Sequence, residues 1–207
     1  MVDNISKNTD NLWLRWAALL HDIGKAPTKK FDKKIGWTFH GHEYMGSKMV
    51  KNIFKRLSLP LNETLKYVQK IVMMSSRPII ISEDIVTDSA VRRLIYDSGD
   101  SMDDLLTLCE ADITTKNVKK SLKYQNNFKI VRNKIKAVEE RDSIRNFQPP
   151  ITGEIIMNHF KIKPCKEIGM IKEKIKNAIL DGEIINDYDQ AFELMLKIGE
   201  SIGLKDE

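Results

Sequence analysis

Three of the four histidines in this chain of 207 residues lie close together, between His21 and His42. His21 is followed at once by Asp22, and an imidazole beside a carboxylate suits a divalent transition metal. Successive helix positions point about 100° apart, so the pair can share an ion lodged near a helix end. Other segments would have to supply further ligands, and the candidates are Asp112, Glu110, His40 and His42.

Each of these residues also has a plainer interpretation. A lone His-Asp pair in a helix is more often a local hydrogen-bonded couple, His40 a surface residue, and His42 an ordinary residue at a helix N-terminus. Lys25 either stabilises negative charge on a phosphoryl group or only complements its helix end. Glu43 follows His42 as in zinc proteases, but Gly46 stands where their second histidine belongs, which excludes that class. The chain also lacks a Walker A sequence, a dinucleotide-type glycine loop and a serine elbow.

The segments that must position this chemistry begin with a helix. Apolar side chains recur at helical spacing from Leu12 to Ile23, after Asn11 as a cap and before Gly24 as a stop, and predict a buried helix. Residues 26–41 lose that period and are interrupted by a proline and two glycines, so we expect a loop that covers the helix end.

The rest of the chain predicts an all-α protein. We expect further helices over residues 42–57, 62–72, 87–99, 101–111, 117–138, 152–160, 165–180 and 188–202. The one strand-like run, residues 77–82, is short, follows a proline and has no second run to pair with, so we expect an extended connector. Asp103 and Asp104 are interpreted as acids at a helix N-terminus rather than as a catalytic pair.

Composition sets broad limits on the class of protein. The chain is 42% apolar and 30% charged, as soluble globular proteins are, and no apolar run approaches the roughly 20 residues that cross a bilayer. Without a signal-peptide pattern, and with Cys109 and Cys165 in helical segments, we expect a cytoplasmic protein with free thiols and no membrane partner. The net charge of +5 permits a polyanionic partner. The Pro-Pro pair at 149–150 predicts a boundary between domains at 1–148 and 149–207.

Several motifs together resemble the HD superfamily of metal-dependent phosphohydrolases: residues 21–25 (His-Asp-Ile-Gly-Lys), 39–43 (Phe-His-Gly-His-Glu) and 108–112 (Leu-Cys-Glu-Ala-Asp). More narrowly, residues 86–94, 109–114 and 149–154 resemble the C-terminal half of bacterial CCA-adding tRNA nucleotidyltransferases, a family often labelled poly(A) polymerase. The resemblance covers nearly the whole chain. It implies a helical HD domain followed by a small tRNA-contacting tail, both normally downstream of a nucleotidyltransferase head.

The resemblance also implies a cofactor and a substrate class. A divalent metal ion, such as Mg²⁺, Mn²⁺ or Ni²⁺, would bind His21, Asp22 and Asp112, and the substrate would be a nucleotide or another phosphate ester. Lys25 and His42 would act in catalysis by stabilising the developing charge.

Two departures from the family pattern predict an incomplete site. The first histidine of the HD ligand set would fall before Met1, and methionine and serine occupy residues 73–76, where relatives carry a histidine shortly before Arg77. Serine is a poor ligand for such metals. No nucleotidyltransferase head precedes residue 12, so we expect a fragment, a truncated gene or a mis-set start that does not add nucleotides by itself.

The tail and two arginines are candidates for RNA contact. Residues 162–171 resemble the tail motif of class II CCA-adding enzymes, with Cys165 where a glycine often follows the proline. The implied phosphate-binding groups are a helix N-terminus with Lys163, Lys166 and Lys172, and an ordinary capped surface helix is the alternative.

Arg92 and Arg93 could contact RNA as well, although ion pairs with Asp88 and Asp97 at helical spacing are preferred. Taken together, we expect first the HD domain and tail of a tRNA nucleotidyltransferase. The second hypothesis is a non-catalytic RNA-binding module with a dead HD site, and the third is a stand-alone HD phosphohydrolase.

Overall fold

The computed structural model describes residues 1–83, 87–115 and 117–204. The regular secondary structure of this part of the chain is helical apart from one small antiparallel sheet, which confirms the all-α prediction. The elements are α1 (Val2–Ile5), α2 (Leu12–Leu20), α3 (Lys25–Thr28), β1 (Lys30–Asp32), β2 (Gly36–Thr38), α4 (His42–Arg56), α5 (Glu63–Met74), α6 (Arg77–Glu83), α7 (Asp88–Ser98), a 3₁₀ turn (Gly99–Ser101), α8 (Met102–Ala111), α9 (Val118–Asp142), α10 (Gly153–Phe160), α11 (Lys166–Asp181) and α12 (Tyr188–Ser201).

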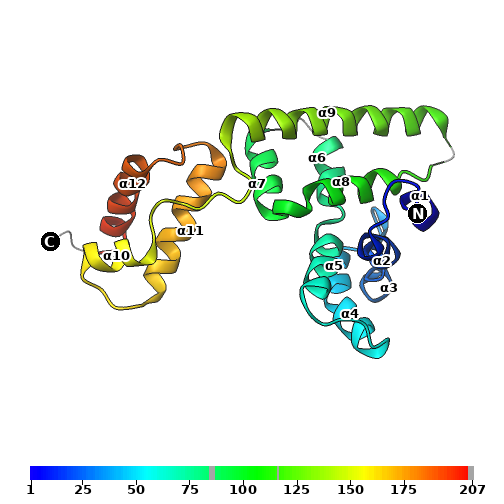
Figure 1. Ribbon diagram of the computed structural model, residues 1–207, viewed down its shortest axis with the longest axis horizontal. Coiled ribbons are helices and arrows are strands. Elements are labelled where there is room, and N and C mark those ends of the chain that lie inside the picture. The colour runs from blue at the N-terminus through cyan, green and yellow to red at the C-terminus, as the bar shows by residue number, and fades with distance from the viewer. Residues whose placement is uncertain (84–86, 116, 205–207) are drawn as a thin grey trace.

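The helices form an elongated arrangement with the two termini at opposite ends (Figure 1). Helices α1 to α5 gather near the N-terminus, α9 runs along one side over α6, α7 and α8, and α10 to α12 form a separate group near the C-terminus. Among the described residues, no helix is both long enough and apolar enough to cross a membrane.

Helix α2 begins where its sequence predicts and ends earlier. The side-chain oxygen of Asn11 accepts hydrogen bonds from the backbone N–H groups of Trp13 (3.0 Å) and Leu14 (3.3 Å), which is an N-cap. The last helical residue is Leu20 rather than Ile23, so the residues that follow form a turn. Buried Leu14, Ala17, Ala18 and Leu20 form its inner face, whereas Leu12 and Leu19 of the predicted stripe are exposed.

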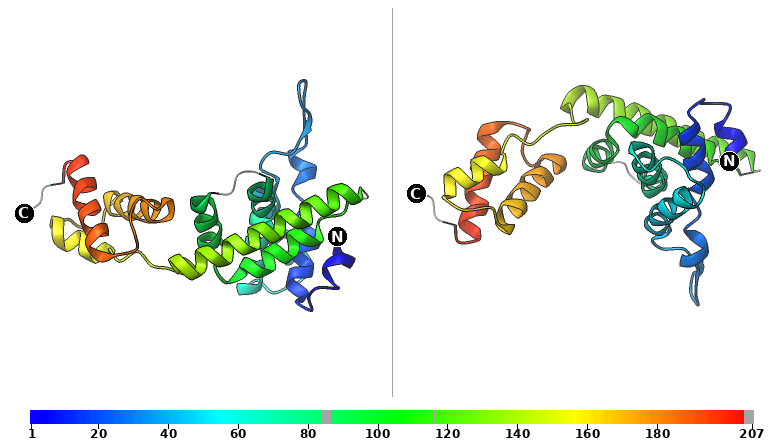
Figure 2. Two further views of the ribbon diagram at one scale, coloured as in Figure 1. Left: turned by 90° about the horizontal axis from the view of Figure 1, so that it is seen from above. Right: turned by 60° about the horizontal axis from the view of Figure 1, so that its bottom comes forward.

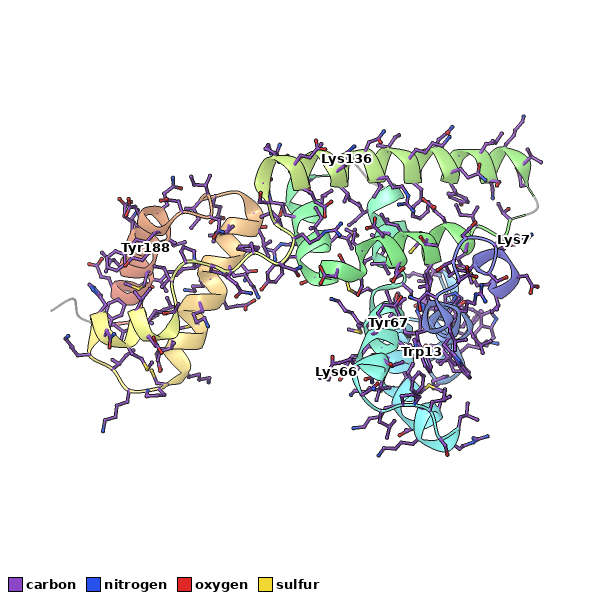
Figure 3. The ribbon with its side chains drawn as sticks, in the orientation of Figure 1. Lys7, Trp13, Lys66, Tyr67, Lys136 and Tyr188 are labelled. Carbon is purple, nitrogen blue, oxygen red and sulfur yellow. The ribbon has the colours of Figure 1, made fainter. Side chains whose placement is uncertain are left out.

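Asn11 also belongs to a polar brace between helices. The hydroxyl of Tyr67 in α5 (Figure 3) donates to Asp104 Oδ2 in α8 at 2.6 Å, and the amide of Asn11 donates to the same hydroxyl at 3.2 Å. Burial and the nearby carboxylate of Asp104 raise the pKa of Tyr67, so the hydroxyl keeps its proton and remains a donor. Asp104 therefore has a structural partner, in agreement with its interpretation as a non-catalytic acid.

The predicted loop at residues 26–41 is largely structured, and that expectation is wrong. It contains α3 and a hairpin in which Phe31 pairs with Trp37 across β1 and β2. The side-chain oxygen of Asp32 accepts hydrogen bonds from the N–H groups of Lys34 (2.7 Å) and Ile35 (3.1 Å), and Gly36 closes the connection with φ of +84°. The hairpin projects away from the helices (Figure 2).

The extended connector expected at residues 77–82 is also wrong, because this run is helix α6. Pro78 lies in the first turn, where a missing N–H breaks no intrahelical bond, and the N–H of Ile80 donates to the Ser76 carbonyl at 3.1 Å. Within the described residues no strand pairs with this run, so the backbone N–H and C=O groups of its isoleucines are hydrogen-bonded in a helix, and this helix packs on α9. Val86, the first residue of one resemblance motif, lies outside the described residues.

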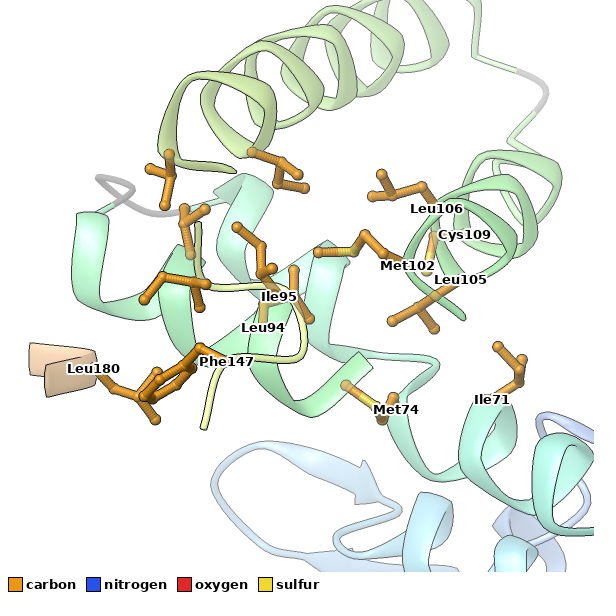
Figure 4. Close-up of a cluster of buried hydrophobic side chains, with 14 of the residues drawn as sticks. Ile71, Met74, Leu94, Ile95, Met102, Leu105, Leu106, Cys109, Phe147 and Leu180 are labelled. Carbon is orange, nitrogen blue, oxygen red and sulfur yellow. The ribbon is translucent and has the colours of Figure 1, made fainter. Parts of the chain in front are cut away.

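One cluster of buried apolar side chains includes residues from both the N-terminal and the C-terminal helices. Side chains from α5, α7 and α8 meet beneath α9, and Phe147 and Leu180 join the same cluster (Figure 4). Leu180 belongs to α11, so the tail packs on the rest of the protein. The proposed boundary at residue 149 follows the end of α9 at Asp142 and precedes α10, and it stays a prediction.

Candidate metal centre

The geometry of His21 defines the candidate site. Its Nδ1 lies 2.8 Å from the Ala18 carbonyl oxygen, and because a carbonyl can only accept, Nδ1 carries the donated proton. The other ring nitrogen, Nε2, is buried and has no hydrogen-bond partner. It lies 3.4 Å from Asp22 Oδ2 and 3.6 Å from Asp112 Oδ1 and forms a hydrogen bond with neither.

This arrangement calls for positive charge. In neutral His21 the lone pair of Nε2 would face two carboxylates, which is unfavourable unless a cation or a proton lies between them. Burial alone lowers the pKa of His21, but Asp112, the Ala18 carbonyl and the charge of Asp22 outweigh burial, so the pKa is raised. The surroundings of His21 thus favour its protonated, positively charged form over the neutral one.

The donor chemistry fits a divalent cation. Two ligands each about 2.1 Å from one ion at a tetrahedral angle lie about 3.4 Å apart, close to the separations of Nε2 from the two carboxylates. Within residues 1–83, 87–115 and 117–204, no group of three or more His, Cys, Asp or Glu side chains already surrounds a point that could hold an ion. His21 Nε2 therefore lies near both carboxylates, and these three side chains are the donors that would hold an ion.

A pair of glycines brings helix α4 against the turn that carries Asp22. A Cβ at Gly24 would lie 2.0 Å from the backbone oxygen of His42 and 2.6 Å from the backbone nitrogen of Gly46. A Cβ at Gly46 would in turn lie 3.2 Å from a methyl group of Val72. Gly24 is therefore required by close backbone approach. Its predicted role of ending the first long helix is wrong, because α2 ends at Leu20 and Gly24 precedes α3.

This close packing places His42 beside Asp22. His42 Nδ1 lies 3.0 Å from the Phe39 carbonyl oxygen, to which it donates, so Nε2 points toward Asp22 Oδ1 at 3.7 Å. Asp22 consequently lies between two imidazoles, with one carboxylate oxygen toward His21 and the other toward His42. Helix α4 begins at His42, as its sequence predicts.

Lys25 is an immediate neighbour of the same carboxylate. Its ammonium group donates to Asp22 Oδ2 at 2.7 Å and lies 6.0 Å from the centre of the Phe39 ring. Lys25 follows the end of α2 at Leu20 by five residues and is the first residue of the short helix α3. Its charge lies beside Asp22 at the candidate site, and both interpretations of its role stay predictions.

Two of the alternative ligands face elsewhere. Glu110 accepts hydrogen bonds from the Arg132 guanidinium, with Nε at 2.6 Å and Nη2 at 3.1 Å, on the α9 side of α8. His40 is exposed and lines a groove beyond His42. Of the four candidates from other segments, Asp112 and His42 join the site.

Ser76 shows what stands near the place of the family's later histidine. Its hydroxyl donates to Glu43 Oε1, and Glu43 is also next to His42, with Oε2 3.3 Å from His42 Nδ1. The glycine at position 46 already excluded Glu43 as the base of a zinc protease. The contacts of Glu43 with His42 and Ser76 had no signal in the sequence, because Glu43 and Ser76 meet only where α4 packs on α5.

Two hollows flank the site. On one side, a cavity of about 360 Å³ is lined by Ile79, Cys109, Asp112, Ile113, Thr114, Thr115, Tyr124 and Phe128. On the other side, a groove of about 360 Å³ runs past Lys25, Trp37, Thr38, Phe39, His40, Gly41, His42 and Glu43. Burial raises the pKa of Cys109, whose thiol donates to the Ser75 carbonyl, so this cysteine stays a neutral core residue.

The two arginines proposed for RNA contact are ion-paired, but with other partners than expected. Arg92 Nε donates to Asp142 Oδ2 at 2.7 Å, and Arg93 Nη2 donates to Asp181 Oδ2 at 2.7 Å. Asp88 pairs instead with Lys134 and Arg141. The partners expected from helical spacing, Asp88 and Asp97, are therefore wrong. Helix α7 packs on α9 and α11, and these helices bring Asp142 and Asp181, which are distant in sequence, to the two arginines.

The three tail lysines lie at the surface near the start of α11. Lys163, Lys166 and Lys172 are all exposed, and Cys165 is the N-cap residue without a side-chain cap bond. They form a separate group from the three donors of the HD-like site, in another part of the chain (Figure 1).

Comparison with known families now identifies the first half of the chain. The family described as HD domain matches residues 2–117, more than half of the 207 residues. The chain belongs to the HD domain family. His21, Asp22 and Asp112 all lie within the matched part, and so does the hairpin, whereas α10 to α12 lie outside the HD domain match.

A curated relative has a tRNA-related activity. The A-adding tRNA nucleotidyltransferase of Deinococcus radiodurans is 33% identical over 103 residues, which are 49% of this chain and 22% of that protein. The chain therefore matches well under two thirds of the relative's length. No solved structure matches the chain.

Proposed function

We propose that the HD domain binds a divalent metal ion through His21, Asp22 and Asp112 and hydrolyses a phosphate ester, in a protein that acts with tRNA. The observation that carries the proposal is the buried Nε2 of His21, which has no hydrogen-bond partner and faces two carboxylates. Membership of the HD family supports the metal, since the donor types suit a divalent ion.

The chain's own groups would organise the reaction around that ion. A bound divalent ion supplies Lewis-acid polarisation of a phosphoryl oxygen and makes water more acidic. Lys25 brings a positive charge to the same carboxylate and can stabilise negative charge that develops on the phosphoryl group. His42 holds its Nε2 toward the site because its Nδ1 donates to the Phe39 carbonyl, so that nitrogen can accept or donate a proton.

The proposal for tRNA rests on the relative and on the tail. The relative is a tRNA nucleotidyltransferase, and the exposed lysines at the start of α11 are suited to phosphates. We infer that this chain supplies HD-domain and tRNA-binding functions to such a protein, with CCA addition or 3′-end processing as the wider process. The domains would be 1–148 for the HD part and 149–207 for the tail.

The test combines metal content with hydrolysis by the full chain. Purified protein is loaded with Mn²⁺, Mg²⁺ or Ni²⁺, its bound metal is measured, and hydrolysis of a chromogenic phosphodiester and of a 2′,3′-cyclic nucleotide is followed. Asp22→Asn should lower both metal content and rate, the rate by about 100-fold or more, because even outer-shell partners of a metal site contribute about 10–100-fold.

Asp10→Asn is the matched control, since Asp10 is a fully exposed carboxylate paired with Arg15 at the surface. It should leave metal content and rate unchanged. If Asp22→Asn hydrolyses both substrates as fast as the unaltered chain, the metal mechanism is wrong.

A second function is favoured by a separate observation. The described side chains do not enclose an ion as they stand, and Ser76 is bonded to Glu43 near the place of a family histidine. This supports a non-catalytic RNA-binding module with a degenerate HD site. Protein that takes up no metal but still binds tRNA would favour this second function over hydrolysis.

A further inference from the structure

The β1–β2 hairpin presents two aromatic rings to solvent. Phe31 and Trp37 are directly opposite across the two strands, so their side chains lie on one face. Their ring centroids are 5.1 Å apart in an edge-to-face arrangement, yet Phe31 is 63% and Trp37 58% exposed. Large exposed aromatic side chains side by side indicate a surface for a partner rather than a core.

One lysine lies over these rings, and three more are close in the sequence. The ammonium group of Lys29, just before β1, lies 4.2 Å from the centre of the Trp37 ring, and the hairpin itself carries Lys30, Lys33 and Lys34. The one carboxylate of the hairpin, Asp32, is used internally, where it accepts two backbone N–H groups of the turn. Asp32 keeps its negative charge, but the four lysines outnumber it, so residues 29–38 carry a net positive charge.

The aromatic face continues to the HD site. Phe39 comes directly after β2 and lines the same groove as Trp37, and the ammonium group of Lys25 lies 6.0 Å from the centre of the Phe39 ring. The groove of about 360 Å³ is lined by both Lys25 and Trp37 and also by His42. Because Lys25 also bonds Asp22, a continuous path of rings and cations leads from the hairpin to the candidate metal centre.

We propose that this hairpin binds single-stranded nucleic acid, with bases stacked on Phe31 and Trp37 and phosphates held by Lys29 and the lysines of the hairpin. Alternating aromatic rings and cations suit this ligand because every base has a face that can stack and every nucleotide carries a negative charge. A duplex would hide its base faces and is disfavoured. This proposal goes beyond the proposed function. Only one part of it rests on the HD site, namely that the bound nucleic-acid strand runs toward His42.

The experiment measures RNA binding by the full chain in EDTA, so that hydrolysis cannot contribute. A short single-stranded RNA labelled with a fluorophore is titrated by anisotropy, and tryptophan emission is recorded in parallel. Trp37 emission should be quenched on binding. Trp37→Ala should weaken binding about tenfold or more, because it removes a stacking ring, whereas Trp37→Phe should keep most of the affinity and lose most of the quenching.

Charge is tested with a variant that leaves both rings in place. Lys33→Ala with Lys34→Ala should weaken binding and reduce the dependence of log affinity on log salt by about one unit for each phosphate that a lysine no longer neutralises. The matched control is Lys119→Ala with Lys123→Ala, which removes two exposed lysines from α9 and should leave the affinity nearly unchanged. Ile130→Ala is the control for loss of an exposed apolar side chain.

Two sets of outcomes would overturn the proposal. One is unchanged RNA affinity in both Trp37→Ala and the Lys33/Lys34 variant, with a duplex probe bound as well as the single strand. The other is that these variants alter only binding to anionic lipid vesicles or self-association in light scattering, which would assign the face to a membrane or a second copy. Failure of Asp22→Asn to affect hydrolysis leaves this measurement untouched, so the two proposals fail separately.

Discussion

The absence of one methyl group at Gly24 allows the candidate metal centre to assemble. The turn after α2 holds Asp22, and α4 holds His42, and these segments meet where backbone atoms of His42 and Gly46 lie against Gly24. Gly24 has an ordinary negative φ of −72°, so the requirement is space rather than backbone conformation. Any side chain there must push α4 away from Asp22.

Gly24→Ala should lower the free energy of unfolding by about 2 kcal/mol or more, because the added Cβ would meet backbone atoms that cannot move independently. Urea unfolding followed by circular dichroism measures this loss, and metal uptake should fall with it.

The matched control is Gly169→Ala, in the open interior of α11, where an added Cβ meets nothing within 4 Å. That change should stabilise the protein by about 0.5–1 kcal/mol through helix propensity. Equal effects of the two substitutions would contradict the close-packing argument.

At the scale of elements, an ion-pair network joins α7, α9 and the tail. Asp142 at the end of α9 accepts a hydrogen bond from Arg92 Nε of α7 at 2.7 Å and from Arg141 at 2.6 Å. The Arg92 guanidinium also occupies the space beside Gly182, where a Cβ would lie 2.7 Å from Nη1. The hydrogen bond from Arg141, together with Arg92, lowers the pKa of Asp142 to about 2.

This depressed pKa makes stability depend on pH with a defined sign. The folded pKa of about 2 is below the ordinary value of 3.8, so the stabilisation by Asp142 is complete above about pH 4 and is lost as the pH falls toward 2. Asp142→Asn should therefore lower the free energy of unfolding by about 1–2 kcal/mol at neutral pH, a value reduced for the solvent exposure of Arg141.

Urea unfolding at neutral pH and at about pH 3 measures the effect, and the gap between variant and unaltered protein should narrow at the lower pH. Asp10→Asn, a fully exposed carboxylate at the other end of the molecule, serves as the control. A gap that stays constant or widens on acidification would argue against stabilisation by the Asp142 carboxylate.

At the scale of the whole molecule, the HD domain and the tail lysines lie in different parts of an elongated chain (Figure 1). We propose that hydrolysis takes place at His21 and Asp22 and that the lysines of the tail near α11 contact the phosphate backbone of tRNA. Phosphate contacts carry no base information, so the tail would hold tRNA without regard to sequence.

Replacing Lys163, Lys166 and Lys172 together with alanine should weaken tRNA binding and reduce the salt dependence of log affinity by about one unit for each phosphate that these lysines neutralise. Hydrolysis of a small phosphodiester should be unaffected, because these lysines lie outside the HD domain match. Titration of tRNA at several salt concentrations checks the first result and a chromogenic assay checks the second.

The control replaces Lys119, Lys123 and Lys129, which are equally exposed on α9 and remove the same charge. If both triple variants weaken tRNA binding alike, the effect is one of net charge and the tail has no special role.

Much of the fold was predictable from local signals. Caps at Asn62, Thr87, Asn117 and Thr152 begin helices where the sequence places them, because a side-chain oxygen meets a backbone N–H only two or three residues away. The strand-like isoleucines of α6 misled the same reasoning, since β propensity acts only where a neighbouring strand exists. The hairpin was not predicted because its two strands have only three residues each, which is too short to show a clear alternating pattern beside a proline and two glycines.

The sequence by itself determined which residues could form the site, since His21-Asp22 and the motifs around His42 and Asp112 indicated the HD family. Tertiary structure decided which of them meet. Nε2 of His21 faces Asp112 only because α8 packs beside α2, and His42 reaches Asp22 only because two glycines let α4 approach. Helix caps and periodicity act between near neighbours in the chain, whereas these distances depend on how whole helices pack, and no local pattern contains that information.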